Sequence, residues 1–247
     1  MNMSKYAIVT GVSSGIGECI ADCFIKEGIY VFGVDENIPK NSKIDFFNSD
    51  IRDEEKIISI INSIKEKTDS IDYLINCAGI FCDKRKRFNW KSFKRRMAKC
   101  YWCQFNRYIF DNKVFYTFIK KSSNGNIINF SSEQVVLPQL KSAPYAITKA
   151  GIEMFSKILA FELMENKIRV NTIALASVKT NFLKRYKKDA NIINEMMEKT
   201  DKNMPFGIIK PNDVYELVKY LTKEGNKITG QTILMDSGVV LDVNKKK

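Results

Sequence analysis

Short runs of apolar residues recur along the chain, and between most of them the apolar residues return with the spacing of a helix. The runs cover residues 5–10, 29–34, 44–48, 71–75, 126–131, 168–173 and 231–235. An unbroken apolar run of this length is typical of a strand that is buried on both faces of a parallel sheet. The alternation of strands with helical segments predicts right-handed crossovers and helices on both faces of that sheet.

The helical segments carry recognisable boundaries. Asp53 is placed to cap the helix that follows it, and Pro211 begins another helix. Between residues 177 and 206 the chain is polar and lysine-rich with a helical middle, which is typical of a substrate lid. We therefore predict the α/β class, with residues 1–247 forming a single-domain doubly wound parallel sheet, the Rossmann fold.

Composition narrows the class of protein. Of the 247 residues, 45% are hydrophobic and 11% are aromatic, which excludes wholesale disorder. The chain has no apolar run of about 18 residues and no signal-like amino terminus, so we expect a cytoplasmic protein without a membrane partner. Six cysteines in such a chain are expected to be free thiols. Cys100 and Cys103 have the spacing of zinc ligands, but without histidine or a second pair we expect no metal site.

The net charge of +12 includes one dense cluster of basic residues. Residues 84–99 contain nine lysines and arginines and no acidic residue, and lysine is also spread over the rest of the chain. A solvated helix face is the favoured interpretation, and docking of an acidic carrier protein or of coenzyme A phosphates is the alternative. Nucleic-acid binding is a third interpretation, which the lack of a recognised binding module disfavours.

A glycine-rich turn joins the first predicted strand to the first helix. Residues 11–17 read Gly-Val-Ser-Ser-Gly-Ile-Gly and follow the strand directly. Glycines let the backbone approach a pyrophosphate, whose charge then meets the unpaired N–H groups at the start of the helix. We predict that a dinucleotide is bound by Gly11, Ser13, Ser14, Gly15, Ile16 and Gly17.

Asp35 ends the second predicted strand, 18 residues beyond Gly17. A carboxylate at this point accepts hydrogen bonds from both adenosine-ribose hydroxyls and repels a 2′-phosphate. No Arg or Lys occupies residues 12–14 or position 36, where a 2′-phosphate would need a cation. We therefore expect NAD as the cofactor in preference to NADP, and a solvated loop carboxylate is the alternative interpretation of Asp35.

Tyr145 and Lys149 offer a proton-transfer pair in a chain without histidine. They are four residues apart in a helical segment, so they share one face of the helix. A nearby ammonium favours the phenolate and lowers the pKa of a tyrosine, which makes Tyr145 a candidate general acid/base and Lys149 its tuner. Ser132 follows the apolar run at 126–131, where the site of an open parallel sheet lies, and its hydroxyl is expected to bond a substrate oxygen.

These motifs together resemble the short-chain dehydrogenase/reductase family from end to end, in particular 3-oxoacyl-ACP reductases and hydroxysteroid dehydrogenases. The matching residues are Thr10, Gly11, Gly15, Ile16, Gly17, Asp50, Asn76, Ala78, Gly79, Ser132, Tyr145, Lys149, Arg169, Val170, Asn171, Thr180, Lys210, Pro211, Asp213, Val214, Thr229, Gly230 and Gln231.

The resemblance implies roles for these residues. Ser132 would orient the substrate oxygen, Tyr145 would pass the proton, and Lys149 would also hold the nicotinamide ribose. The resemblance further implies a homo-oligomer, a tetramer or dimer, and a small-molecule secondary alcohol or ketone as substrate. Acyl thioesters, hydroxysteroids and sugar alcohols are the candidates. Further cofactor contacts are implied for Asp50, Ile51, Asn76, Ala78, Gly79, Val178 and Thr180.

Two departures from the family pattern leave an alternative open. The asparagine that usually serves the proton relay is not identifiable, and Gln104 and Asn106 are both candidates. The usual Pro-Gly after the Arg-Val-Asn strand is replaced by Leu175 and Ala176, which is expected to reshape the backbone beside the nicotinamide. A catalytically impaired, NAD-binding regulatory protein of the same fold is therefore the alternative to an active oxidoreductase.

Overall fold

A computed structural model describes residues 5–79, 94–95, 97–98, 116–140, 142–180 and 190–242. Several sequence predictions fall outside these ranges: the relay candidates Gln104 and Asn106, the pair Cys100 and Cys103, and nearly all of the basic cluster at 84–99. The segment 181–189 of the predicted lid is outside them as well.

The described residues form a sheet of seven parallel strands in the order β3-β2-β1-β4-β5-β6-β7. This confirms the predicted α/β class, and each strand agrees within two residues at either end with its apolar run. The strands are β1 (Tyr6–Thr10), β2 (Tyr30–Asp35), β3 (Asp45–Asn48), β4 (Tyr73–Asn76), β5 (Asn126–Ser132), β6 (Arg169–Leu175) and β7 (Thr232–Met235).

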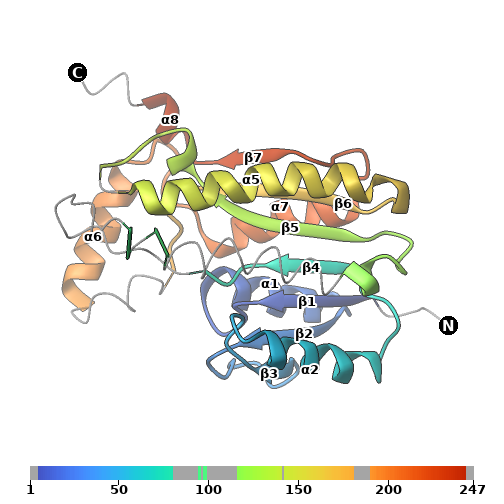
Figure 1. Cartoon of the computed structure of the whole chain (residues 1–247). Coiled ribbons are helices and arrows are strands. Elements are labelled where there is room, and N and C mark those ends of the chain that lie inside the picture. Colours follow the sequence, from blue (N-terminus) through green and yellow to red (C-terminus); the bar gives the residue numbers. More distant parts are fainter. Residues whose placement is uncertain are drawn as a thin grey trace.

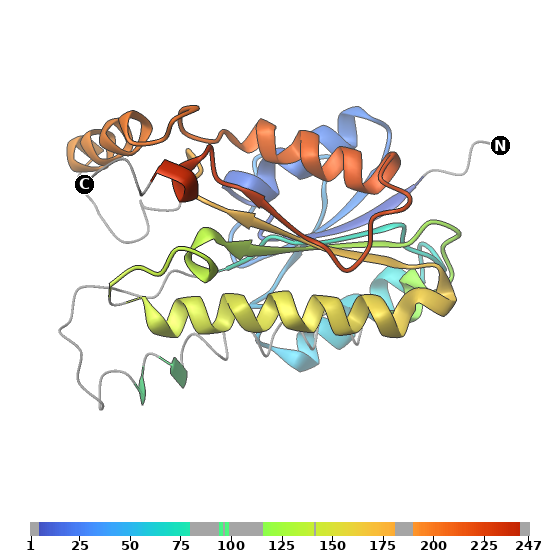
Figure 2. The same cartoon turned by 90° about the horizontal axis from the view of Figure 1, so that it is seen from above.

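Helices cover both faces of the sheet (Figures 1 and 2), as predicted. One face carries α1 (Gly15–Lys26) and α7 (Pro211–Lys223), and the other carries α2 (Glu54–Lys65) and α5 (Ala143–Leu163). Along β1, Ala7 and Val9 are buried in the core that includes α1 and α7, whereas Ile8 is buried in the core that includes α2 and α5. Because neighbouring residues of a strand point to opposite faces, both faces require apolar side chains.

The remaining elements lie near the ends of the strands. The 3₁₀ segments η2 (Glu133–Val135) and η3 (Met164–Asn166) follow β5 and α5 directly. The helices α6 (Ala190–Lys202) and α8 (Val239–Asp242) lie beyond the carboxyl ends of the strands (Figure 1). Asp53 caps α2 as predicted, because its side chain accepts a hydrogen bond from the backbone N–H of Lys56 at 3.1 Å. Among the described residues, no helix is long and apolar enough to cross a membrane.

The strand order has one reversal, between β1 and β4. In open parallel sheets the ligand crevice lies outside the carboxyl ends of the strands at such a reversal. The loops that follow β1 and β4 therefore flank the position where a ligand is expected.

Candidate active site

The glycine turn after β1 is closely packed. Gly11 and Gly15 have positive φ angles of 73° and 63°, which side chains rarely adopt. A Cβ atom at Gly17 would lie 2.2 Å from the carbonyl oxygen of Gly11, so no side chain fits there. Ser14, the cap of α1, makes no side-chain hydrogen bond to the helix, which leaves the N–H groups of the first turn to other acceptors. This turn fits the approach of a pyrophosphate.

Small residues after β4 make the tight turn possible. A Cβ atom at Gly11 would lie 2.7 Å from the Cα atom of Ala78, and the backbone N–H of Ala78 donates to the Thr10 hydroxyl at 3.3 Å. Gly79 has open space around the position of its missing Cβ atom. Ala78 therefore packs directly against the glycine turn. This contact explains why a small residue is needed at position 78, and the sequence pattern did not indicate it.

Asp35 lies at the carboxyl end of β2 and is only 7% exposed. Its carboxylate accepts hydrogen bonds from the backbone N–H of Ser13 at 3.1 Å and of Asn37 at 3.0 Å. The alternative interpretation, a solvated loop carboxylate, is therefore wrong, because the side chain is buried and bonded to the glycine turn.

Asp50 and Ile51 follow β3. The carboxylate of Asp50 accepts hydrogen bonds from the guanidinium of Arg52, which hold the pKa of this carboxyl below its usual value. The same guanidinium lies 4.0 Å from a carboxylate oxygen of Glu36, the residue after Asp35. Ile51 packs partly against the core formed with α2. No sequence pattern singles out Arg52, because its contacts with Glu36 and Asp50 come from the folded chain.

Asn76 is fully buried at the end of β4 and begins a polar chain through the core. Its side-chain amide donates to the side-chain oxygen of Asn129 at 2.8 Å, and Asn129 in turn donates to the hydroxyl of Ser156 at 2.8 Å. Ser156 lies on α5, so this chain connects the strand beside the glycine turn to the helix that carries Tyr145 and Lys149.

The segment after β6 returns to the glycine turn. Val178 forms a parallel bridge with Ile209, and Thr180 lies next to Gly15, where an added Cβ atom would be 3.2 Å from the Thr180 methyl carbon. Leu175 completes β6 in register with Ser132, and the N–H of Ala176 donates to the carbonyl of Met235 at 3.1 Å. The Leu175 and Ala176 positions are thus part of regular pairing with the neighbouring strands.

Ser132 ends β5, and Tyr145 and Lys149 lie near the start of α5, which packs against β5 and η2. Ser132 and Lys149 are 3% and 6% exposed, while Tyr145 is partly exposed. The ammonium of Lys149 lies 5.7 Å from the centre of the Tyr145 ring and donates to the carbonyl of Phe130 at 2.9 Å. The proximity of phenol and ammonium that the four-residue spacing predicts is present.

Glu133, which directly follows Ser132, is a further residue of the site that the sequence motifs do not include. The hydroxyl of Ser132 donates to the carboxylate of Glu133 at 2.8 Å, and the amide of Gln139 donates to the other carboxylate oxygen at 3.1 Å. The sequence feature that could have indicated Glu133 is its place as an acidic residue between a buried strand and the apolar residues Val135 and Val136.

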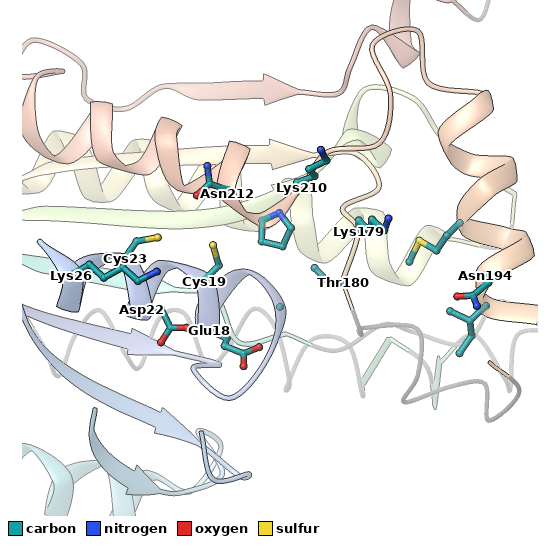
Figure 3. Close-up of a pocket in the computed structure, with 14 residues that line it drawn as sticks. Glu18, Cys19, Asp22, Cys23, Lys26, Lys179, Thr180, Asn194, Lys210 and Asn212 are labelled. Atoms are coloured by element: carbon teal, nitrogen blue, oxygen red, sulfur yellow. The ribbon is translucent and has the colours of Figure 1, made fainter. Parts of the chain in front are cut away.

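A groove of about 700 Å³ begins beside Gly15 and Thr180 and follows the outer face of α1 towards the amino end of α7 (Figure 3). Cys19 and Cys23 line it, one turn apart on α1. Burial raises the pKa of Cys19 to about 11 and also raises the pKa of Cys23, so both groups are protonated at neutral pH. Together with Cys77, they are free thiols as predicted.

Comparison with known proteins gives consistent matches along nearly the whole chain. A family model described as short chain dehydrogenase matches residues 5–191. The 3-oxoacyl-[acyl-carrier-protein] reductase FabG of Chlamydia muridarum is 30% identical over 261 residues, covering 96% of this chain and 98% of the relative. Glucose 1-dehydrogenase 2 of Bacillus subtilis is 29% identical over 264 residues, covering 96% and 95%. The ligand-free aldohexose dehydrogenase of Thermoplasma acidophilum is 25% identical with a TM-score of 0.85, covering 96% and 94%.

Proposed function

The chain belongs to the short chain dehydrogenase family of oxidoreductases, and we propose that it interconverts a secondary alcohol and its ketone with NAD as cofactor. The observation that supports this proposal is the position of the Lys149 ammonium, which lies 5.7 Å from the centre of the Tyr145 ring and donates to the carbonyl of Phe130 on β5, the strand that ends at Ser132. When bound, the nicotinamide supplies the carbon that accepts or donates the hydride.

Tyr145 is the group that moves the proton. In alcohol oxidation its phenolate takes the proton from the substrate hydroxyl, and in ketone reduction its phenol returns a proton to the substrate oxygen. The Lys149 ammonium stabilises the phenolate by its charge, and its hydrogen bond to the Phe130 carbonyl holds it beside the ring. Ser132 holds the substrate oxygen at the end of β5. These groups supply position and electrostatic stabilisation.

The preference for NAD over NADP rests on charge at the end of β2. A buried carboxylate at Asp35, bonded to the glycine turn, disfavours a second negative group at the ribose. The guanidinium of Arg52 is bonded to Asp50 and lies close to Glu36, so two carboxylates already share its charge. Gly11, Gly15 and the start of α1 are proposed to bind the pyrophosphate, and Asn76, Ala78, Val178 and Thr180 the rest of the cofactor.

The chain is proposed to act as a homo-oligomeric catalytic domain, with residues 177–206 serving as the substrate lid. The named relatives act on very different compounds. One acts on an acyl group that a carrier protein holds, and the other acts on glucose. We therefore propose only a small secondary alcohol or ketone as the substrate class.

The experiment is a screen for oxidation and reduction with NAD⁺, NADH, NADP⁺ and NADPH over aldoses, polyols, hydroxysteroids and 3-oxoacyl thioesters. With any active pair, Tyr145→Phe is expected to lower kcat by at least about 100-fold, because the proton donor is removed. Tyr220→Phe, on the exposed face of α7, is the matched control and should keep full activity. Full activity in Tyr145→Phe would contradict the proposed role of this phenol.

A further inference from the structure

Two thiols face the groove that runs along α1 (Figure 3). Cys19 and Cys23 are four residues apart on this helix, and both sulfur atoms point from it towards the amino end of α7. Each side chain is half-buried, and each thiol shifts the pKa of the other, as close neighbours do. The proposed oxidoreductase chemistry uses neither of them. The pair is therefore open to a ligand that enters the groove.

The spacing of the two side chains disfavours a disulfide. Side chains four residues apart on a helix have Cβ atoms about 5–6 Å apart. A disulfide joins Cβ atoms that are about 3.5–4.5 Å apart. A direct bond between Cys19 and Cys23 would therefore distort α1 close to its start at Gly15. A single atom bonded to both sulfurs adds the length of a second bond and suits the wider spacing.

The surroundings of the pair decide which kind of atom this is. Within the described ranges, no three or more side chains of His, Cys, Asp or Glu are grouped so that they could hold a metal ion. A structural zinc site takes four such ligands, so this pair does not suit zinc. Thiolates are soft ligands that select Cu(I), and Cu(I) is stable with two of them. The chain also contains no histidine that could compete for the ion.

We propose that Cys19 and Cys23 form a two-thiolate binding site for a soft monovalent cation, Cu(I). This site is separate from the proposed oxidoreductase function and does not depend on it. On binding, two S–H bonds break, two S–Cu bonds form and two protons pass to the solvent, with no change in oxidation state. The complex carries one negative charge. The ammonium of Lys26, which lines the same groove and acts on both thiols, offsets that charge.

Protonation distinguishes this pair from a reactive cysteine. Burial raises the pKa of both thiols, so neither is a thiolate at neutral pH. The thiolate is the form of cysteine that attacks electrophiles. We therefore expect the pair to react slowly with alkylating reagents and to exchange its two protons for a metal ion.

The first experiment measures Cu(I) transfer from its coloured bicinchoninate complex to the protein under argon. It uses a two-thiol chain, the full chain with Cys77, Cys82, Cys100 and Cys103 replaced by serine, because Cys100 and Cys103 could bind the same ion. Phenol red in weak buffer counts the released protons. We expect one Cu(I) per chain and about two protons per ion. A chain that takes no Cu(I), or that binds it without releasing protons, would overturn the inference.

Removal of one thiol tests whether the ion is shared. In the two-thiol chain, Cys23→Ser should lower the Cu(I) affinity at least about 100-fold, because the loss of an outer-shell partner alone costs up to about 100-fold. Bicinchoninate competition measures this ratio. Equal affinities with one thiol and with two would contradict a shared ion.

The matched control moves one thiol and keeps the number of thiols at two. Cys19→Ser combined with Glu18→Cys places the thiols five residues apart, about 140° around α1, where one ion cannot reach both. The exchange also removes an acidic side chain, which by itself would favour an anionic complex. We therefore expect the moved pair to bind Cu(I) as weakly as Cys23→Ser does. Undiminished affinity in the moved pair would overturn the inference.

A second experiment uses the chain without any substitution. Cleavage by trypsin after Lys5 and Lys26 releases residues 6–26, a peptide that contains Cys19 and Cys23 and no other cysteine. The folded chain is treated with N-ethylmaleimide, with and without two equivalents of Cu(I), and this peptide is analysed by mass spectrometry. Cu(I) should protect both thiols together, and bathocuproine should restore their labelling. Labelling at the same rate with and without Cu(I) would show that the pair does not bind the ion.

Discussion

Single residues at this site serve structure and proposed chemistry together. Asp35 was selected from the sequence for its charge, yet its carboxylate also holds the N–H of Ser13 in the glycine turn. Ala78 was selected as a small residue beside a nucleotide, and it is also the residue on which Gly11 packs. A substitution at either position therefore changes the shape of the turn as well as its contact with a cofactor.

Exchange of Asp35 for serine tests the proposed cofactor preference. Asp35→Ser removes the negative charge at the end of β2, so the ratio of NADP affinity to NAD affinity should rise about tenfold or more. Fluorescence titration with NADH and NADPH measures both dissociation constants. Asp22→Ser is the control, because Asp22 lies on α1 and accepts a hydrogen bond from Asn41. An unchanged ratio in Asp35→Ser would show that Asp35 does not set the preference.

At the scale of elements, α1 and α7 are joined by an ionic contact at one end. The carboxylate of Glu27, which follows α1, pairs with Lys219 at 3.0 Å and with Lys223, both on α7. Burial alone would raise the pKa of Glu27, but the hydrogen bonds from Lys223 and Lys219 and the nearby hydroxyl of Tyr215 outweigh it and lower the pKa to about 2. The Tyr215 phenol has its own pKa raised, mainly by burial.

Glu27→Gln is expected to make stability less dependent on pH. Because the folded pKa of Glu27 is below its unfolded value of 4.5, the ionised carboxylate stabilises the fold above about pH 4.5, and this contribution is lost as the pH falls towards 2. At neutral pH the variant should lose about 2–3 kcal/mol of unfolding free energy. Urea unfolding at pH 7 and pH 3 measures the difference, which should shrink at the lower pH. If the difference in unfolding free energy between wild type and variant is the same at both pH values, ionisation of Glu27 does not stabilise the fold.

A second element contact holds the carboxyl end of α7 to β6. The guanidinium of Arg169 is buried and donates to the carbonyls of Leu221 and Gly225, both at 2.6 Å. Burial lowers the pKa of this guanidinium. The family motif that begins at Arg169 therefore has a structural role here: it satisfies carbonyl groups in the last turn of α7 and in the residues that follow it.

Arg169→Met is expected to lower the unfolding free energy by about 3 kcal/mol, because the buried carbonyl groups of α7 lose their donor. Chemical denaturation measures this loss, and Lys43→Met, at an exposed position, is the control that should change stability by less than about 0.5 kcal/mol. If both variants unfold alike, the carbonyl groups of α7 have found other partners.

At the scale of the whole molecule, one surface of α5 stays apolar and exposed. Ile147, Met154, Ile158 and Phe161 follow helical spacing, and Phe161 is 74% exposed. Leu159, by contrast, packs partly against the core. The sequence pattern alone does not separate these two groups, whereas their exposure does. An exposed apolar stripe of this kind fits the proposed homo-oligomer.

Phe161→Glu combined with Ile158→Glu should reduce the molecular mass in solution to that of the monomer, because two charges would be buried in the proposed interface. Light scattering after size-exclusion chromatography measures the mass. Phe206→Glu is the control, since Phe206 is more exposed still but lies outside α5. A wild type that is already monomeric would exclude this interface.

The sequence alone determined the order and type of the main elements. Strands buried on both faces must be apolar throughout, and this periodicity is a local property that can be read along the chain. The glycine turn and the Tyr145–Lys149 pair were found for the same reason, because each lies within a few consecutive residues. The family resemblance added Asp50, Asn76 and Thr180, which no local pattern would have selected.

Only the tertiary structure decided which distant or neighbouring groups bond to one another. The contact of Arg52 with Glu36, the chain from Asn76 through Asn129 to Ser156, and the Ser132–Glu133 hydrogen bond depend on distances and rotamers. Hydrogen bonds act over about 3 Å and depend on orientation, whereas a sequence pattern specifies only the face of an element. For this reason the sequence indicates where the site is, and the folded chain determines what each polar group in it offers to a ligand.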